Sequence, residues 1–534
     1  MSATRKSKKE RAEEAAAIDA AALARRYARY VIVVMVVFAV VMAILSIQRH
    51  RDFKSARYDV GIMTQTVYNT AHGRILEATN ADGKQASRLG SHVDPILALF
   101  ALPWLVWPSP VMLLVAQALI VALAAWPAYR LGRRFLGDPR AAFIMAAALL
   151  LYPPTQRAVL DGFHPVTLVL PFLLFAFLYL EEDRPWVAVP FLLLAALCKE
   201  EIPLLLAMMG LYFALRKRRW WPLLITGVAI AWFVVAVAVV IPHYQAGGSP
   251  FVDRYSDYGS SPGEVAKNVF LKPGQTAGDL LSRSNLSYLN DLLWPLGYTP
   301  LLSPLTLLIA APEFFINGLS SHAFQRSTAF HYVATEIPFL FAASLLGIAR
   351  LRRWLERRRA AAPSLRGAWA RLDRRLTVMS LSALVLIITA AANYIDGPLP
   401  FSLPGARFSG VDYRVGSHSL VLREAVAMIP EGDDVVVSTA NVTGGHLSEH
   451  RVVFGFPLFE GADWVIVDQS RPFVFDKEDI IKHDEALGRL VLNQGFQSVY
   501  ARDQVYVFKK VVGGPVTPPP AGGAPPLPGG SATP

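Results

Sequence analysis

Long apolar stretches dominate the sequence and constrain its fold more than any other feature. A bilayer core about 30 Å thick takes roughly 20 apolar residues as a helix, so each such stretch predicts a transmembrane helix. Only 17% of the residues are charged, against about 25% in soluble domains, which excludes a soluble enzyme of this size. We therefore predict an α-helical polytopic membrane protein. The apolar runs are Tyr30–Ile47, 111–131, 141–157, 166–180, 186–199, 201–215, 220–241, 331–349 and 376–394.

Basic residues predict the orientation of these helices. Clusters of Lys and Arg precede the first run and follow later ones at 130–140, 216–219 and 350–375. Because positive residues collect on the cytoplasmic side, we expect a cytoplasmic N-terminus and a multi-pass protein of a bacterial cytoplasmic membrane, with the lipid bilayer as its surroundings. The net charge of +11 is then mostly a topology signal, and we expect no nucleic-acid partner. The single cysteine, Cys198, excludes a disulfide framework.

The stretch 288–318 contains an even number of crossings, because run 220–241 is predicted to end outside and run 331–349 to begin there. Pro295, Pro300 and Pro304 interrupt it near its middle. This pattern suits either a hairpin of two short spans or a buried re-entrant pair. With the hairpin, the chain has about eleven transmembrane helices.

The remaining segments define the expected domain organisation. Residues 1–29 form a basic cytoplasmic tail, and residues 30–394 form the transmembrane domain with outer loops 48–110 and 242–287. Residues 395–510 are expected to form a small extracytoplasmic α/β domain, and the Pro/Gly-rich residues 511–534 to be disordered. The α/β prediction rests on four β-rich segments, at 435–437, 452–454, 464–467 and 505–508. Two segments with helical patterns lie at 419–428 and 484–493.

Four groups of polar residues lie at the predicted outer ends of the spans. Polar residues near a bilayer are costly and are therefore candidates for function. Structural charges would scatter to both faces, so this convergence on one face predicts a shared site. The groups are Asp59 with His92 and Asp94 in the first loop, Asp161 with His164, Lys199 with Glu200 and Glu201, and Arg326 with His331 and Tyr332.

Each group also has a purely structural interpretation. Asp59 begins a stretch in which apolar residues recur at helical spacing, so it could be a helix N-cap on a helix lying flat on the membrane. Asp161 and His164 could share a metal ion or form a hydrogen-bonded turn. The charges at 199–201 could line a cavity or form an interfacial ion pair.

Several motifs, in this order along the chain, resemble known membrane proteins. They are Tyr58-Asp59-Val60-Gly61 with Gln65, Gly90-Ser91-His92 with Pro95, Phe163-His164-Pro165, Lys199-Glu200 and His331-Tyr332. Together these motifs are similar to a bacterial membrane family, domain of unknown function 2079, over roughly residues 50–470. The order of first span, Asp-led outer loop and half-inserted helix at 96–107 also resembles the GT-C superfamily of integral-membrane glycosyltransferases. That superfamily commonly has two adjacent acids where this chain has Asp59 and Val60.

The resemblance implies transfer of a sugar from a polyprenyl-phosphate-linked donor to a carbohydrate or lipid acceptor of the envelope, on the outer face. Asp59 would be the general base, which contributes about 10²–10⁴-fold. A divalent metal at Asp161 and His164 is compatible with this chemistry but not required, and no nucleotide cofactor is expected because no Walker or GxGxxG motif is present. The substrate-binding residues would be Gln65, His92, Asp94, Lys199, Glu200, Arg326, His331 and Tyr332.

Two other function classes remain open at this point. A transporter or flippase would need polar residues at mid-membrane depth on broken helices facing a pathway. A non-catalytic envelope scaffold presenting residues 395–509 would leave Asp59, His92, Lys199 and Glu200 far apart. The position of these four side chains therefore discriminates between the hypotheses.

Overall fold

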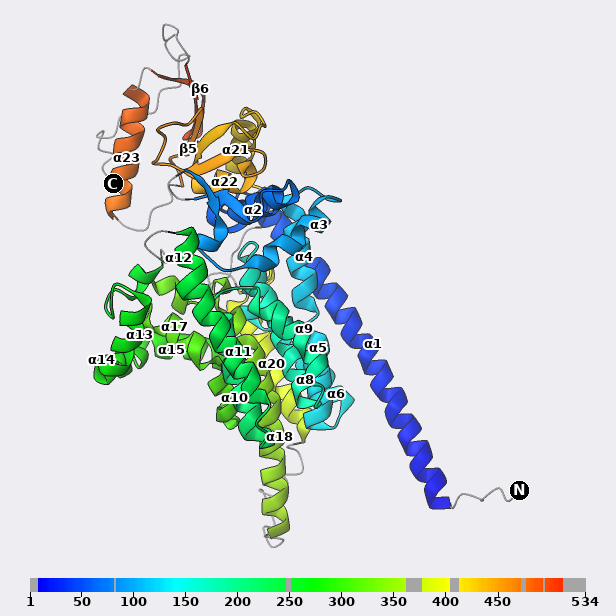
Figure 1. The fold of residues 1–534 in the computed structure, drawn as a ribbon. Helices are drawn as coiled ribbons and strands as arrows, with labels where there is room; N and C mark the ends of the chain where they lie inside the picture. The colour runs from blue at the N-terminus through cyan, green and yellow to red at the C-terminus, as the bar shows by residue number, and fades with distance from the viewer. Residues whose placement is uncertain are drawn as a thin grey trace.

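The computed structural model shows a helical bundle with an α/β unit at one end (Figure 1). It describes residues 8–80, 83–245, 251–361, 377–403, 413–471, 477–492 and 495–511. We call the end next to the α/β unit the domain end, and the opposite end, which carries Arg134, Arg216, Arg352 and Arg353, the basic end. The predicted Pro/Gly-rich tail lies outside the described residues except for Val511.

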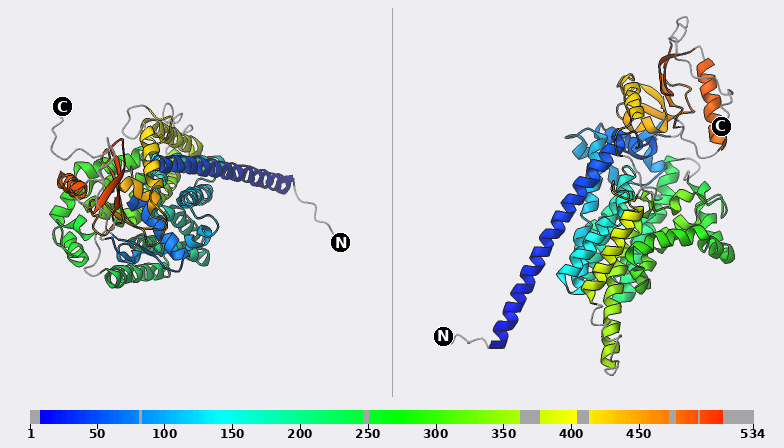
Figure 2. Two further views of the ribbon diagram at one scale, coloured as in Figure 1. Left: turned by 90° about the horizontal axis from the view of Figure 1, so that it is seen from above. Right: turned by 180° about the vertical axis from the view of Figure 1, so that it is seen from behind.

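The bundle is built from helices that follow the predicted apolar runs. α1 leans away from the others at its N-terminal end, and α18 extends beyond the bundle at the basic end (Figures 1 and 2). The helices after the first loop are α4 Pro110–Ala122, α5 Ala125–Leu136, α6 Pro139–Leu151, α7 Pro153–Leu160, α8 Val169–Glu181, α9 Pro185–Ala196, α10 Ile202–Lys217, α11 Pro222–Val235, α12 Ile241–Tyr244, α18 Ile337–Ala361 and α20 Val378–Asp396, and α1 is Lys8–Arg51.

Many of these helices begin with proline, which lacks the N–H that would have no partner in the first turn. Ser109 and Asp138 precede two of them and accept hydrogen bonds from the backbone N–H groups of Val111 and Arg140. Side-chain acceptors at this position satisfy free donors at a helix start. Residues within the short connections thus satisfy free N–H groups at the starts of these helices.

Four helices of the described residues are long and apolar enough to cross a membrane, and a bent pair, Pro139–Leu151 with Pro153–Leu160, makes a fifth. The four cover Ile18–Arg51, Pro110–Leu136, Pro222–Tyr244 and Val378–Asp396. Shorter apolar helices occupy Pro95–Trp104, Pro165–Glu181, Pro185–Ala196 and Pro304–Leu319. The helical membrane-protein character is therefore supported, and the count of eleven spans stays a prediction.

The stretch 288–318 enters the bundle and turns back, as a series of short helices. Tyr152 at the domain end of α6 donates to the Leu292 carbonyl, whereas Arg350 near the basic end donates to the Leu302 carbonyl. Each proline of the stretch starts a new short helix, which is the interruption expected from the sequence. The elements are α15 Arg283–Leu293, η7 Trp294–Leu296, η8 Thr299–Leu302, α16 Pro304–Leu307, η9 Leu308–Ala310 and α17 Ala311–Leu319.

The second polar loop, 242–287, is more structured than its composition indicated. It contains η6 Val252–Tyr255, α13 Pro262–Leu271 and α14 Pro273–Leu280, which project to one side of the bundle with α15 (Figure 1). The Ser261 side chain caps α13 by accepting from the Glu264 N–H. This cap, followed by proline at the first helical position, is a local start signal.

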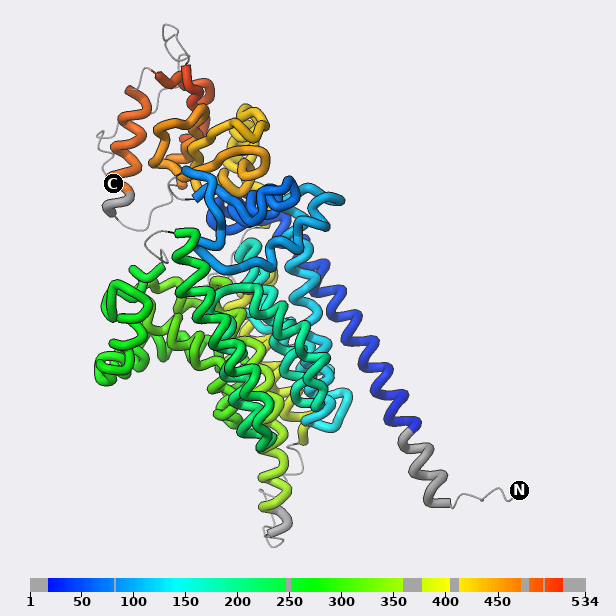
Figure 3. Tube along the Cα trace, viewed as in Figure 1, coloured from blue at the N-terminus to red at the C-terminus, as the bar shows by residue number. Residues whose placement is uncertain are grey.

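The first loop fills the space between the bundle and the α/β unit (Figure 3). Its apolar residues Val60, Met63 and Val67 recur at the predicted spacing and are buried in the main core. They therefore pack against protein, where the sequence predicted a membrane surface. The elements are a π-helix η1 Arg57–Gly61, α2 Ile62–Ala71, a two-stranded sheet of β1 Glu77–Thr79 and β2 Gln85–Ser87, η2 Arg88–Gly90, η3 Pro95–Phe100 and α3 Ala101–Trp104.

The C-terminal unit has a five-stranded mixed sheet in the order β4-β3-β5-β7-β6. β3 runs parallel to β4 and β5, and β7 runs antiparallel to β5 and β6. The four predicted strands correspond to β3, β4, β5 and β7, while β6 and α22 were not predicted. The elements are α21 Ser417–Ala427, β3 Val436–Thr439, α22 Asn441–Leu447, β4 Val452–Gly455, β5 Trp464–Asp468, α23 Lys477–Leu492, β6 Phe496–Arg502 and β7 Val505–Lys510.

Arg57 joins the first loop to this unit. Arg57 is 1% exposed. Its side chain donates hydrogen bonds to the carbonyls of Val453 on β4, of Thr79 at the end of β1 and of Asn80, the next residue. Gly444 of α22 lies against it, and a Cβ there would stand 2.4 Å from the Arg57 Cβ. Only glycine permits this close approach of α22 to η1.

We expect Arg57→Met to weaken the attachment of the C-terminal unit by roughly 2–5 kcal/mol, because hydrogen bonds from a charged donor contribute about 1.5–3 kcal/mol each. The weaker attachment should appear as faster amide hydrogen exchange of Val452–Gly455, measured on the purified chain. Arg74→Met is the matched control, because Arg74 pairs with Asp433 across the same contact but both side chains are more than 40% exposed. Such a pair contributes about 1 kcal/mol or less. Equal acceleration in both variants would contradict the assignment.

Candidate functional site

Four acidic and histidine side chains meet at the domain end of the bundle. They are Asp59, Asp161, His164 and His331, which we call the acid–histidine cluster. Asp59 lies in η1, Asp161 follows α7, His164 precedes η4 (Pro165–Leu168), and His331 begins η11 (His331–Thr335). Three connections far apart in the sequence therefore supply one site.

Gly162 allows the first two connections to touch. Its φ of +86° lies in the left-handed region, and a Cβ at this position would stand 3.1 Å from the Asp59 Cβ. The Asp161-Gly162 turn thus requires glycine for both its conformation and its neighbour. Gln117 of α4 also fixes the turn, because its amide donates to the carbonyls of Val159 and Gly162 and accepts from the His164 N–H.

Hydrogen bonds and ring stacking hold the cluster together. Both the backbone N–H and the Nδ1 of His331 lie within hydrogen-bond distance of Asp161 Oδ2, at 2.9 and 2.8 Å. The rings of His164 and His331 stack with centroids 3.5 Å apart. His164 Nε2 lies 3.6 Å from Asp59 Oδ1 and 3.9 Å from Asp161 Oδ2.

The enclosure of the cluster shifts its protonation equilibria. Burial, and then the like charge of Asp161, raise the pKa of Asp59, and burial also raises the pKa of Asp161. Burial and the neighbouring imidazole of His331 lower the pKa of His164. Asp59 nevertheless keeps 34% of its side chain exposed, whereas the other three are 8–17% exposed. A bound molecule can therefore reach the Asp59 carboxylate directly.

Asp161, His164 and His331 also form the one group among the described residues whose geometry suits a metal ion. Each offers one ligand atom, and these three atoms lie within 4.8 Å of one another. Mixed imidazole and carboxylate ligands are typical of zinc and other transition metals. The predicted Asp161–His164 pair is thus joined by His331, which the sequence had placed with the substrate-binding residues.

A second polar group, the Lys199 cluster, comprises His92, Lys199, Glu200 and Glu201. His92 Nδ1 lies 2.8 Å from Glu200 Oε1, and the other oxygen of Glu200 accepts from the Val93 N–H at 2.9 Å. Lys199 Nζ lies 2.5 Å from Glu201 Oε1. Although burial opposes ionisation, His92 and Lys199 hold the pKa of Glu200 below its usual range.

Tyr332 connects the two clusters. It follows His331 in η11, and Lys199 Nζ lies 5.8 Å from the centroid of its ring. The centroids of the Tyr332 and His331 rings lie 4.2 Å apart. The acid–histidine cluster and the Lys199 cluster are therefore adjacent parts of one region, and Asp59, His92, Lys199 and Glu200 are not scattered.

Three further predicted residues have other partners. Asp94 forms a buried ion pair with Arg88, at 2.8 Å. The Gln65 side chain bonds to Thr79 and to the Arg451 carbonyl, so it ties α2 to the first loop and the C-terminal unit. Arg326 donates to the Gly318 carbonyl. None of these contacts involves Asp59.

Sequence patterns did not single out Arg57, Arg88, Glu313 or Glu336. Glu313 and Glu336 are 3% and 2% exposed, and Glu336 accepts a hydrogen bond from the Tyr288 hydroxyl at 2.7 Å. Glu313 lies between Pro312 and Phe314, and such a charge among apolar residues needs a partner inside the protein. Arg57 and Glu336 find theirs in distant segments, whereas Arg88 pairs with Asp94 six residues further on.

Comparisons with known proteins place the chain in a family. The crystal structure of ArnT from Cupriavidus metallidurans in the apo state is similar to it with a TM-score of 0.48 and 12% sequence identity, over 90% of this chain and 98% of that one. No curated protein matches the chain. A family model described as a predicted membrane protein, DUF2079, matches residues 49–507. The chain therefore belongs to the DUF2079 family of predicted membrane proteins.

Proposed function

We propose that the protein is a membrane glycosyltransferase that transfers a sugar from a polyprenyl-phosphate-linked donor to an envelope acceptor. The observation that carries the proposal is the accessible Asp59 carboxylate inside a cluster of buried acidic and histidine side chains. The basic residues at the opposite end support an orientation with that end in the cytoplasm and the site on the outer face. A lipid-linked donor reaches such a site from the bilayer.

The transfer requires a base and a place for the leaving phosphate. Asp59 removes the proton from an acceptor hydroxyl while the acceptor oxygen bonds to the anomeric carbon and the bond from that carbon to the phosphate oxygen breaks. The electron pair leaves with the polyprenyl phosphate. Lys199 and Tyr332 lie beside the cluster and offer a cation and a hydrogen-bond donor to that anion. His92 and Glu200 shape the same region.

We also propose that Asp161, His164 and His331 bind a divalent metal ion. The stacked imidazoles and the shared carboxylate provide a compact nitrogen and oxygen donor set. A bound cation would stabilise negative charge that develops on the leaving phosphate. Asp59 lies beside this set through His164 and remains the base.

The clustering also bears on the alternatives. A scaffold that only presents the C-terminal unit gives no reason for buried acids and histidines from three connections to converge. A transporter needs its polar residues along a pathway at mid-membrane depth, whereas these lie at helix ends. The convergence of these side chains and their position at helix ends therefore both favour a catalytic site at the domain end.

We expect Asp59→Asn to lower sugar transfer by about 10²–10⁴-fold, because the substitution keeps the shape and removes the base. The assay uses the full chain in lipid nanodiscs with a panel of polyprenyl-phosphate sugars and measures released polyprenyl phosphate. Asp257→Asn, an exposed acid of the second polar loop, is the matched control and should keep its activity. Undiminished transfer in the Asp59 variant would remove it from the role of base.

Metal binding is measured separately from activity. We expect the full chain to bind about one Zn²⁺ or Mn²⁺ ion in equilibrium dialysis with metal analysis. His164→Ala and Asp161→Asn should each weaken binding by about tenfold or more, because each removes one ligand of three. His322→Ala is the control, since this histidine lies outside the cluster. Equal binding by all four proteins would exclude the site.

A further inference from the structure

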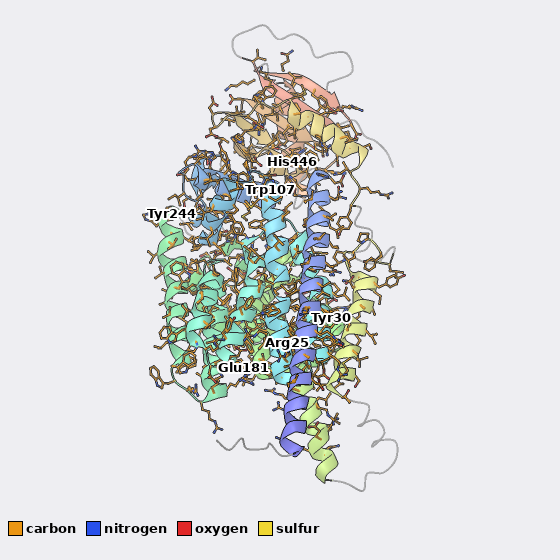
Figure 4. All side chains as sticks on the ribbon, turned by 90° about the vertical axis from the view of Figure 1, so that its right-hand side faces the viewer. Arg25, Tyr30, Trp107, Glu181, Tyr244 and His446 are labelled. Carbon is orange, nitrogen blue, oxygen red and sulfur yellow. The ribbon has the colours of Figure 1, made fainter. Side chains whose placement is uncertain are left out.

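A cavity of about 620 Å³ lies at the basic end of the bundle, opposite the proposed catalytic site. Glu181, which lines it, is labelled toward that end of the helices in Figure 4. Five helices surround the cavity, namely α5, α8, α10, α18 and α20. Its lining combines basic and apolar side chains, among them Arg134, Arg353, Phe135 and Leu346.

The lining carries four arginines against two glutamates. Glu181 is almost fully buried and is neutralised by Arg216, at 3.0 Å, with Arg134 at 3.5 Å. Arg352 lies 2.8 Å from Glu356. Within the described part of the chain Arg353 has no carboxylate partner, and its Nε donates to the Ala349 carbonyl. The cavity therefore has a surplus of positive charge.

Apolar side chains also line the cavity, next to the basic ones. Phe135 and Leu136 end α5, Leu346 and Ala349 belong to α18, and Val378 begins α20. The aromatic ring of Phe135 lies 5.8 Å from the Arg216 guanidinium. A space lined by both cations and apolar side chains matches a molecule with an anionic head and an acyl chain.

We propose that this cavity binds the phosphate group of an anionic phospholipid from the adjacent leaflet. Arginine binds phosphate oxygens through two parallel N–H donors, which favours phosphate over a simple counter-ion. Basic pockets between transmembrane helices on the cytoplasmic side are suited to anionic head groups. The basic clusters favour a cytoplasmic position for this end, and there the arginines would meet the head groups of the adjacent leaflet. The inference is independent of the proposed glycosyltransferase activity.

The test uses the full chain purified in a mild zwitterionic detergent. The chain is titrated with phosphatidylglycerol, phosphatidylcholine or inorganic phosphate, and the complexes are detected by native mass spectrometry. The pocket variant is Arg353→Gln combined with Arg134→Gln. The matched control is Arg357→Gln combined with Arg219→Gln, which removes the same charge from exposed positions outside the lining. Arg353→Lys with Arg134→Lys keeps the charge and reports on folding, together with the retention volume in size-exclusion chromatography.

We expect the unaltered chain to bind one phosphatidylglycerol at least tenfold more tightly than phosphatidylcholine. The pocket variant should lose about tenfold in affinity for each arginine removed, as expected for loss of a charge-assisted contact, while the control stays within about twofold of the unaltered chain. Equal losses in both glutamine variants would overturn the proposal, because they would indicate diffuse attraction to the basic end. Binding of inorganic phosphate with no preference between the lipids would overturn the lipid assignment.

Discussion

The buried guanidinium of Arg57 is the interaction on which the arrangement of the domain end depends. A charge without access to water needs acceptors in fixed positions, and Arg57 finds them on β1 and its turn and on β4 of the C-terminal unit. Asp59 follows two residues later in the same π-helix. The C-terminal unit therefore does more than cover the bundle, because it fixes the backbone segment that presents the accessible carboxylate.

The two ends of the bundle carry different kinds of charged residues. Acids and histidines meet at the domain end, where burial raises the pKa of the Asp59 and Asp161 carboxyls and lowers that of the His164 imidazole. Arginines gather at the basic end around Glu181. Few charges are present between these ends, since the helices that connect them are almost entirely apolar.

The sequence allowed the apolar helices and most residues of the candidate site to be predicted, for physical reasons that are local. The length and composition of a run such as Tyr30–Ile47 predict an apolar helix. A charge beside such a run can also be identified from the sequence alone. The pairings were not predictable, because they depend on packing between distant segments. His331 bonds to Asp161 across 170 residues, and Gln65 bonds to the Arg451 carbonyl of the C-terminal unit. The helices α13 and α14 were missed because their polar composition is also typical of loops.

The long separation of the cluster residues along the chain has a consequence for biosynthesis. Asp59 and Asp161 enter the membrane region well before His331 is synthesised, and the acceptor of Arg57 on β4 follows more than a hundred residues after that. Until His331 is made, Asp161 lacks the imidazole that bonds to its Oδ2, and until β4 is made, the segment that carries Asp59 lacks its contact with the C-terminal unit. The site is consequently one of the last parts of the molecule to assemble, and a chain interrupted before residue 453 carries all four cluster residues without the contact that fixes the first of them.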